Sequence, residues 1–316
     1  FCAGAVLAVT IFQKNDIPGV RPRQLKKNGF TFDMGPSWYW MPDIFENFFQ
    51  DFGKTTSDFY ELERLDPGYQ IYFKDKLLKI YADLNKLCET FEEIEKGSGK
   101  RLKKFISKAK ENYKIAIGKV VMRPGKSPLE LVTPETAIRV GQFLKSVSGV
   151  IQKEFKDEAL RAALEFPVLF LGAKPENTPS FYIFMNYADY GLGTWHPKGG
   201  MYEIVKAMVS IAESKGVKIH TSSSVSEIKI SNDNMAEGVV LENGSYHKAD
   251  FIVSGADYHH SESLLPLSYR QYSEEYWEKR TFAPSSLLFY VGFDKKLSNT
   301  FTHHNLFFDT DFKAHA

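Results

Sequence analysis

The clearest pattern of apolar and polar positions lies between Gly193 and Ile230. Six apolar residues recur there three and four positions apart: Met201, Ile204, Val205, Met208, Ile211 and Ala212. This spacing places them on one face of a helix. Lys215-Gly216 ends the helix, since glycine adopts the left-handed conformation that closes one, and Val217 and Ile219 then alternate as in a strand. The segment predicts half of a βαβ unit, whose strand can add in parallel to a sheet formed earlier in the chain.

Further strands are predicted where apolar residues alternate or form short runs. The first run, Leu7–Phe12, ends at Gln13. A strand over 29–36 leads into a tight turn, and hairpins are predicted over 65–80 and around Glu242-Asn243-Gly244. Residues 251–253 are apolar on both faces, which indicates a buried strand. Residues 287–293 and 306–308 are predicted to join the hairpin over 65–80 in a second sheet, assembled from separate parts of the chain.

Helical spacing dominates from Leu84 to Tyr190, with breaks at 97–99, 123–125, 133–134 and 174–175. Two apolar helix faces within this region each fit more than one environment. Leu102, Phe105, Ile106 and Ala109 form one apolar face surrounded by lysines, which suits either a packed helix with a solvated rim or a basic helix lying on a bilayer. The stripe from Val140 to Ile151 is either core or lipid-facing. The aromatic run over 38–52 is typical of a core, and it could also line a channel for an apolar substrate.

Composition excludes several classes of protein. The chain has 316 residues, 43% of them hydrophobic, which suffices for two or more structural units. A net charge of +1 argues against nucleic acid as a partner. No window approaches the ~20 apolar residues that span a bilayer. Cys2 and Cys88 have no metal-ligand or redox spacing, so the cytoplasm is expected. The chain begins without methionine or a signal peptide, and we expect it to be a fragment.

No set of residues in the sequence predicts catalysis by side chains alone. His259-His260 and His303-His304 are adjacent pairs that diverge on a strand or helix, and they lack a carboxylate or cysteine at ligand spacing, so no metal site is predicted. The catalytic residues stay unknown. Asp33, Asp257 and Glu165 are the carboxylates nearest the motifs described next. Catalysis is therefore expected to depend on a cofactor.

The four motifs Pro18-Gly19-Val20-Arg21, Phe32–Pro36, Trp195–Gly200 and Ala249–Asp257 occur in an informative order and spacing. Together they resemble the bacterial-type phytoene desaturases, FAD-dependent carotenoid desaturases of the flavin amine-oxidoreductase superfamily. The resemblance covers nearly the whole chain. It implies an α/β fold with an incomplete Rossmann-like FAD-binding domain, an antiparallel-sheet substrate domain and a helical insert. The FAD-binding domain would comprise residues 1–57 and 191–262, and the substrate-domain sheet residues 58–83 and 263–316. The helical insert would comprise residues 84–190.

The resemblance also implies where FAD binds. The positions are Gln13, Gly19, Arg21, Gly35, Pro36, Val225, Gly255 and Ala256. Three features depart from the family pattern. Gln13 stands where an acidic residue binds the adenosine ribose, Val20 replaces a glycine, and Pro22 removes an N–H donor. The first strand and its glycine-rich loop are missing, with Ala3-Gly4-Ala5 as a possible trace, so we expect the 316-residue chain by itself to be inactive.

Three functions are compatible with these observations. The first is desaturation of phytoene or a related polyene by a flavin, with the protein peripheral to a membrane. The second is oxidation of an amine, porphyrinogen or retinoid on the same fold, because one fold hosts many substrates. The third is a non-catalytic remnant that binds carotenoid or lipid, motivated by Gln13, Val20 and Pro22. The aromatic helical insert favours the first. The sequence leaves the carotenoid, the electron acceptor and the oligomeric state open.

Overall fold

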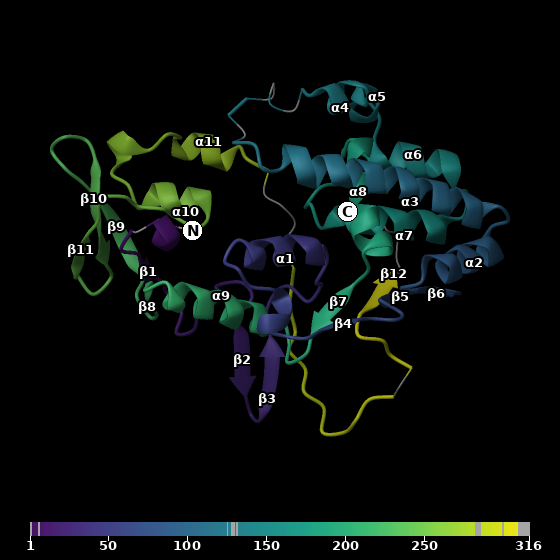
Figure 1. Cartoon of the computed structure of the whole chain (residues 1–316), viewed down its shortest axis with the longest axis horizontal. Helices are drawn as coiled ribbons and strands as arrows, with labels where there is room; N and C mark the ends of the chain where they lie inside the picture. Colours follow the sequence, from purple (N-terminus) through teal and green to yellow (C-terminus); the bar gives the residue numbers. More distant parts are fainter. Residues whose placement is uncertain are drawn as a thin grey trace. The chain divides into compact units, whose positions relative to one another are not determined.

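The computed structural model describes residues 2–5, 7–124, 126–127, 130, 132–281, 286–298 and 300–308. Its helices and small sheets form two compact units, labelled by element in Figure 1. Unit 1 comprises Phe1–Ser37 and Gly199–Phe282, and unit 2 comprises Trp38–Lys198 and Ala283–Ala316. The mixed α/β class expected from the sequence is confirmed. The finer division into three parts stays a prediction.

Unit 1 contains the βαβ half expected from the sequence. Helix α9 (Tyr202–Ser214) buries Ile204, Val205, Ala207 and Ile211. Gly216, with φ at +77°, closes it in the left-handed conformation. Strand β8 (Lys218–His220) then pairs in parallel with β1 (Thr10–Phe12), and Ile11 lies opposite Ile219. The parallel addition to an earlier strand is confirmed.

The rest of unit 1 consists of two antiparallel ribbons and short helices. Strands β9 (Val225–Ile230), β10 (Ala236–Leu241) and β11 (Tyr246–Lys248) form a three-stranded antiparallel sheet, in which β10 and β11 make the hairpin expected around Gly244. A second hairpin, β2 (Gln24–Lys27) and β3 (Phe30–Asp33), turns at Asn28-Gly29, and the sequence analysis missed β2. The helical elements are η1 (Cys2–Ala5), α10 (Tyr258–Ser263), η7 (Leu267–Tyr269) and α11 (Glu274–Glu278).

The buried strand predicted over 251–253 is wrong. Phe251 and Val253 are 81% and 84% exposed, and the segment is irregular. Among the described residues of unit 1, β1 and β8 form the only parallel pair, and neither lies against this run. An apolar run forms a buried strand only where neighbouring strands and covering helices exist, because unpaired backbone groups are costly to bury.

Unit 2 has a small mixed sheet. The hairpin of β5 (Tyr69–Phe73) and β6 (Leu77–Ile80) was expected and is confirmed, and β12 (Asn305–Phe308) joins β5 in parallel, so the sheet is not purely antiparallel. The contribution from a distant part of the chain is also confirmed. Strand β4 (Leu62–Arg64) pairs with β7 (Trp195–Pro197). Helix α1 (Pro42–Gln50) and η2 (Thr56–Asp58) precede them.

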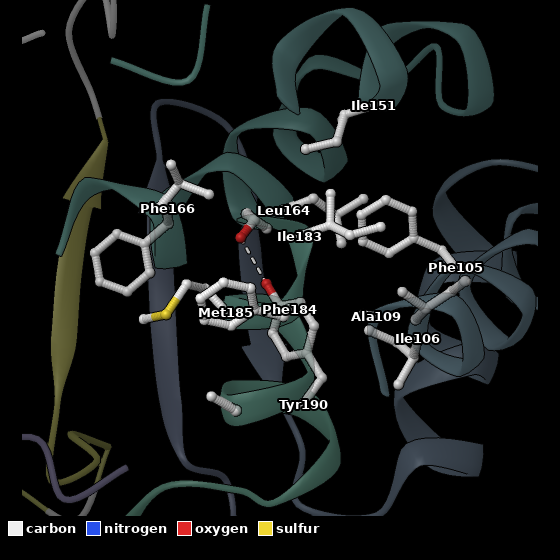
Figure 2. Packing of buried hydrophobic residues seen from close by; sticks show 14 of the residues in the cluster. Phe105, Ile106, Ala109, Ile151, Leu164, Phe166, Ile183, Phe184, Met185 and Tyr190 are labelled. Atoms are coloured by element: carbon white, nitrogen blue, oxygen red, sulfur yellow. Dashed lines mark hydrogen bonds between the residues drawn. The ribbon is translucent and has the colours of Figure 1, made fainter. Parts of the chain in front are cut away.

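The helical region over 84–190 packs around one apolar core (Figure 2). Gly97 and Thr133 precede two of its helices, as the predicted breaks require, and Gly125 lies outside the described residues. Its elements are α2 (Leu84–Ile94), α3 (Ser98–Ile115), η3 (Ala116–Val120), α4 (Pro134–Ala137), α5 (Val140–Phe143), α6 (Val147–Glu154), α7 (Glu158–Leu169), η5 (Ser180–Ile183), α8 (Phe184–Asn186) and η6 (Tyr187–Gly191).

The two stripes left open by the sequence are packed differently. On α3, Leu102, Phe105, Ile106 and Ala109 are all buried in the core, so this face is a packed helix with a lysine rim and has no apolar side left for a bilayer. The other stripe divides: Val147 and Ile151 are buried, whereas Val140 and Leu144 are exposed. In the described part of the chain, no helix is long and apolar enough to cross a membrane.

The strand predicted over 287–293 is also wrong. Residues 286–293 have an irregular backbone, and Leu287 and Phe289 are 81% and 77% exposed. Of the described residues near the chain end, only β12 joins the sheet of unit 2, beside β5. The alternation that predicts a strand is local, whereas its hydrogen-bond partners must come from elsewhere.

Candidate functional site

Gln13 lies at the carboxyl end of β1, where the parallel pair ends. Its backbone N–H donates to His220 O at 2.9 Å, and its carbonyl accepts from Ser223 N at 2.7 Å. Its side-chain Nε2 donates to the carbonyl of Ile17, which holds the following loop against the strand end. The carboxyl ends of parallel strands are where α/β folds bind ligands. Gln13 therefore lies at a strand end of this kind, with one hydrogen of its side-chain amide bound inside the protein.

Gly35 and Gly19 pack closely on the same short stretch of backbone, Gly35 against Arg21 and Gly19 against Pro22. A Cβ on Gly35 would lie 2.8 Å from the carbonyl oxygen of Arg21. A Cβ on Gly19 would lie 2.9 Å from the Pro22 carbonyl oxygen and 3.2 Å from the Val205 methyls of α9. Both glycines have positive φ, at +112° for Gly19 and +89° for Gly35. Within this closely packed loop, over residues 19–22, Arg21 remains exposed to solvent.

Val20 adopts φ of +49°, in the left-handed region that disfavours a β-branched side chain. This is the position where the resemblance expects glycine. Since the side chain is 61% exposed, little packing is lost on its removal. We expect Val20→Gly to raise the free energy of unfolding by about 0.5 to 1 kcal/mol, after the greater chain entropy of glycine is subtracted.

Urea unfolding checks this prediction, with Asn28→Gly as a matched control. Asn28 has φ of +51°, but asparagine tolerates this conformation, so its replacement should change stability by less than half as much. A loss of stability in Val20→Gly would contradict the account of strain.

Two of the three carboxylates near the motifs cap helices. Asp33 Oδ2 accepts from Met201 N at 2.7 Å, at the residue that precedes α9, and so ties the Phe32–Pro36 motif to Gly199-Gly200. Asp257 Oδ1 accepts from the backbone N–H groups of His259 and His260 at 3.1 and 3.3 Å. Both carboxylates compensate N–H groups that a helix start leaves unpaired. Glu165 is buried in α7 of unit 2.

The remaining predicted positions have fewer contacts with the residues around Gln13 and Gly19. Val225 begins β9 two residues after Ser223, which contacts Gln13. Pro36 is exposed beside Gly35. Gly255 and Ala256 are exposed in a turn held to α10 by the Ser254 and Ser261 hydroxyls, 2.6 Å apart. The hydrogen bonds of this turn run to α10 rather than to the loop around Gly19.

A dense aromatic cluster lies within unit 2. Trp38 is its centre: the ring stacks on His304 with centroids 4.1 Å apart and meets Tyr69 edge-on at 4.9 Å. Phe166 and Phe170 each lie 5.6 Å from it, and Phe170 also lies 4.6 Å from Trp40. Trp38 is half-buried and Phe170 is 47% exposed, so the cluster reaches the surface of the unit. Such a wall can hold an extended apolar ligand.

A buried carboxylate network adjoins this cluster. Asp189 Oδ2 accepts from the Tyr69 hydroxyl at 2.5 Å, and Asp189 Oδ1 accepts from Thr194 Oγ1 at 3.4 Å. Trp40 Nε1 donates to the same Thr194 oxygen at 2.8 Å. Burial raises the pKa of Asp189 to about 7, against the opposing effect of the Tyr69 and Thr194 hydrogen bonds. The carboxyl can therefore exchange a proton near neutral pH.

The sequence analysis did not single out Asp189, although a signal was present. Asp189 is the one charged residue between Glu176 and His196. An isolated acid in a long uncharged aromatic stretch is either buried or at a site. Phe170 and His304 gave no such signal, because their contacts with Trp38 join segments more than a hundred residues apart.

The histidines make ring contacts. The His196 and His303 rings lie 4.2 Å apart, and burial followed by the neighbouring His196 lowers the pKa of His303. Within the described ranges, no group of three potential metal ligands occurs.

This chain is similar to several carotenoid desaturases, including the following three. A carotenoid 3,4-desaturase of Haloarcula japonica is 36% identical over 100% of this chain and 64% of its own length. A zeta-carotene-forming phytoene desaturase of Myxococcus xanthus is 30% identical over 97% of this chain and 59% of its length. A 4,4'-diapophytoene desaturase of Staphylococcus haemolyticus is 30% identical over 97% and 62%. The chain thus spans about three fifths of each relative.

Two solved structures support the fold. A protein from Pyrococcus furiosus aligns with a TM-score of 0.53 and 16% identity, over 88% of this chain and 60% of its own. An oxidoreductase from Methanosarcina mazei aligns with a TM-score of 0.51 and 18% identity, over 83% and 56%. The model of the flavin containing amine oxidoreductase family matches residues 3–307, which agrees with the FAD expected from the sequence. The chain belongs to the flavin containing amine oxidoreductase family.

Proposed function

We propose that the protein carrying this chain is an FAD-dependent oxidoreductase that desaturates a carotenoid precursor, phytoene or a close relative. The observation that carries the proposal is the 36% identity to a carotenoid 3,4-desaturase over the whole chain. Two further relatives act on precursors of the same chemical kind, by their names. The aromatic cluster around Trp38 supports the same substrate class, because a long polyene offers only apolar surface to bind.

Unit 1 would hold the flavin in a Rossmann-like manner. Gln13 at the strand end is suited to a ribose hydroxyl, and the exposed Arg21 to a phosphate. Gly19 and Gly35 pack closely on the backbone of residues 21–22, and this packing fixes the position of the Arg21 backbone from which the side chain extends. The other proposed contacts are Pro36, Val225, Gly255 and Ala256. When bound, FAD supplies the hydride acceptor that desaturation needs.

Unit 2 would orient the polyene. Trp38, Phe166 and Phe170 present ring faces and edges along which a conjugated chain can lie, and a chain bound there would displace water from them. The Asp189 carboxyl is fully buried and accepts a hydrogen bond from the Tyr69 hydroxyl, with 2.5 Å between the two oxygens. This bond holds the tyrosine ring in place. Orientation and water exclusion are thus the roles we assign to these residues.

We also propose that the protein is cytoplasmic and associates peripherally with a membrane, since a carotenoid precursor dissolves in lipid. The amphipathic face of α3 does not provide the contact, because its apolar residues are buried.

The principal alternative is a flavin oxidoreductase for an amine, retinoid or porphyrinogen. Anaerobic mixing of the flavin-loaded product of the complete gene with phytoene in detergent, and separately with putrescine, distinguishes the two. We expect phytoene to bleach the flavin absorption and putrescine to leave it unchanged. Bleaching by the amine alone would overturn the proposal, and bleaching by neither would favour a non-catalytic carotenoid-binding protein.

A further inference from the structure

The stretch of unit 2 from Val121 to Leu144 exposes several large apolar side chains to solvent. Six large apolar residues are each more than half exposed: Val121, Met122, Val132, Ile138, Val140 and Leu144. Met122, Ile138 and Leu144 are 83% to 85% exposed, which is rare for such side chains in a folded unit. We refer to these six residues as the 121–144 surface.

Positive charge accompanies this surface. From Lys119 to Lys145 the chain has five basic and two acidic residues. A cavity of about 350 Å³ opens beside Ile138, and its lining includes Lys108 of α3, Arg139, Lys145 and Lys153 of α6. One carboxylate, Glu154, lies among them, and Glu111 lies 3.5 Å from the Arg139 guanidinium. Cations thus remain in excess around the apolar side chains.

The backbone over residues 133–139, within this stretch, is hydrogen-bonded within itself. Thr133 Oγ1 accepts from Thr136 N at 3.1 Å, and Thr136 Oγ1 accepts from Thr133 N at 2.8 Å. Ala137 N and Arg139 N donate to the carbonyls of Thr133 and Thr136 at 2.8 and 2.9 Å. The exposed apolar run over 286–293 differs, because its backbone is irregular rather than helical. A short helical segment with paired backbone can face lipid, whereas an unpaired strand cannot.

We propose that the 121–144 surface contacts an anionic lipid bilayer, with its apolar residues at the level of the acyl chains and the surrounding cations near phosphate groups. Exposed apolar side chains, excess positive charge and a paired backbone are the three properties that an interfacial segment needs. The inference deepens the proposed function, because a surface held on a bilayer gives the protein access to a substrate dissolved there.

Vesicle flotation of the complete gene product tests the apolar part. The probe is phosphatidylcholine vesicles containing about a third phosphatidylglycerol. We expect Ile138→Glu with Leu144→Glu to lower the partition coefficient at least tenfold. The matched control is Leu267→Glu, which replaces a 76% exposed leucine of unit 1 and should float as the parent does. An unchanged partition coefficient in the double variant, or an equal loss in the control, would overturn the proposal.

The charged part has its own variant. Lys145→Glu with Lys153→Glu should weaken binding to anionic vesicles roughly tenfold or more, because each cation near such a surface contributes about a fivefold factor, and should leave binding to neutral vesicles unchanged. Lys100→Glu with Lys104→Glu, exposed on α3, is the control with the same charge change. Equal losses of vesicle binding in the two double variants would mean that binding depends only on the net charge of the protein. That result would overturn the proposal of a local contact at the 121–144 surface.

Assays in detergent separate this inference from the proposed function. The Ile138→Glu, Leu144→Glu variant should reduce its flavin with detergent-dissolved phytoene at the parent's rate, and lose at least fivefold when phytoene is supplied in vesicles. A parent protein that floats but never oxidises a polyene would contradict the proposed function and leave the lipid contact intact. A parent that oxidises the polyene but does not float would contradict the lipid contact.

Discussion

Asp189→Asn is expected to become more stable relative to the parent as the pH rises from 4 to 7. Burial raises the pKa of the Asp189 carboxyl from 3.8 to about 7. Between these values the folded protein retains a proton that the unfolded chain releases, so the parent loses stability with rising pH, by about 4 kcal/mol in total. Below pH 4 both states are protonated, and above pH 7 both are ionised, so the difference is flat there. Asparagine removes this dependence.

Urea unfolding followed by tryptophan fluorescence measures the effect, because three of the four tryptophans lie in unit 2. The quantity to compare is the difference in unfolding free energy between variant and parent at each pH, which cancels the titration of other groups. Asp83→Asn, at an exposed helix cap of unit 2, is the control: backbone hydrogen bonds from Lys86 and Asn85 hold the pKa of Asp83 below its ordinary value, so its difference should vary little over pH 5 to 7. A constant difference for Asp189→Asn would contradict a buried, proton-binding carboxyl.

Gly200→Ala is expected to destabilise unit 1 by roughly 3 kcal/mol. Gly200 has φ of +102°, which an alanine adopts only with strain, and the added Cβ would lie 2.3 Å from Asp33 Oδ2. The carboxylate must then move and give up its hydrogen bond to Met201 N at the start of α9. Strain and the lost charged hydrogen bond each contribute about 1 to 2 kcal/mol.

Gly216→Ala provides the comparison for this prediction. Gly216 also has positive φ, at +77°, but a Cβ added there would meet no atom within 4 Å, so only the strain of about 1 kcal/mol is expected. Urea unfolding monitored by circular dichroism gives both values. Equal costs in the two variants would show that the contact with Asp33 contributes nothing to stability.

Local patterns predicted the elements whose partners lie close in sequence or have strong end signals. The helix after Gly200 and the hairpin at Gly244 each contain their own stop or turn residue, and both are confirmed. Asn28-Gly29 is an equally strong hairpin signal, and both residues have positive φ, at +51° and +80°. That hairpin could have been predicted from the sequence.

Residues 251–253 and 287–293 show where local patterns fail. Each is apolar enough for a strand, yet a strand also needs hydrogen-bond partners, and no local pattern specifies them. The same limit applies to the aromatic cluster. The sequence indicated aromatic residues over 38–52, but the contact of Trp38 with His304 and Phe170 depends on the tertiary fold. Asp33 shows a further limit, because its spacing to Gly200 gives no hint that it caps α9.

We propose that a protein with this chain introduces double bonds into a carotenoid precursor. The most direct measurement is the absorption spectrum of lipid extracts, taken after the flavin-loaded product of the complete gene has been incubated with phytoene in anionic vesicles and an electron acceptor. We expect new bands at longer wavelength, because desaturation lengthens the conjugated system, and no such bands without FAD. Recovery of unchanged phytoene from flavin-loaded, vesicle-bound protein, with an amine oxidised under the same conditions, would contradict the claim.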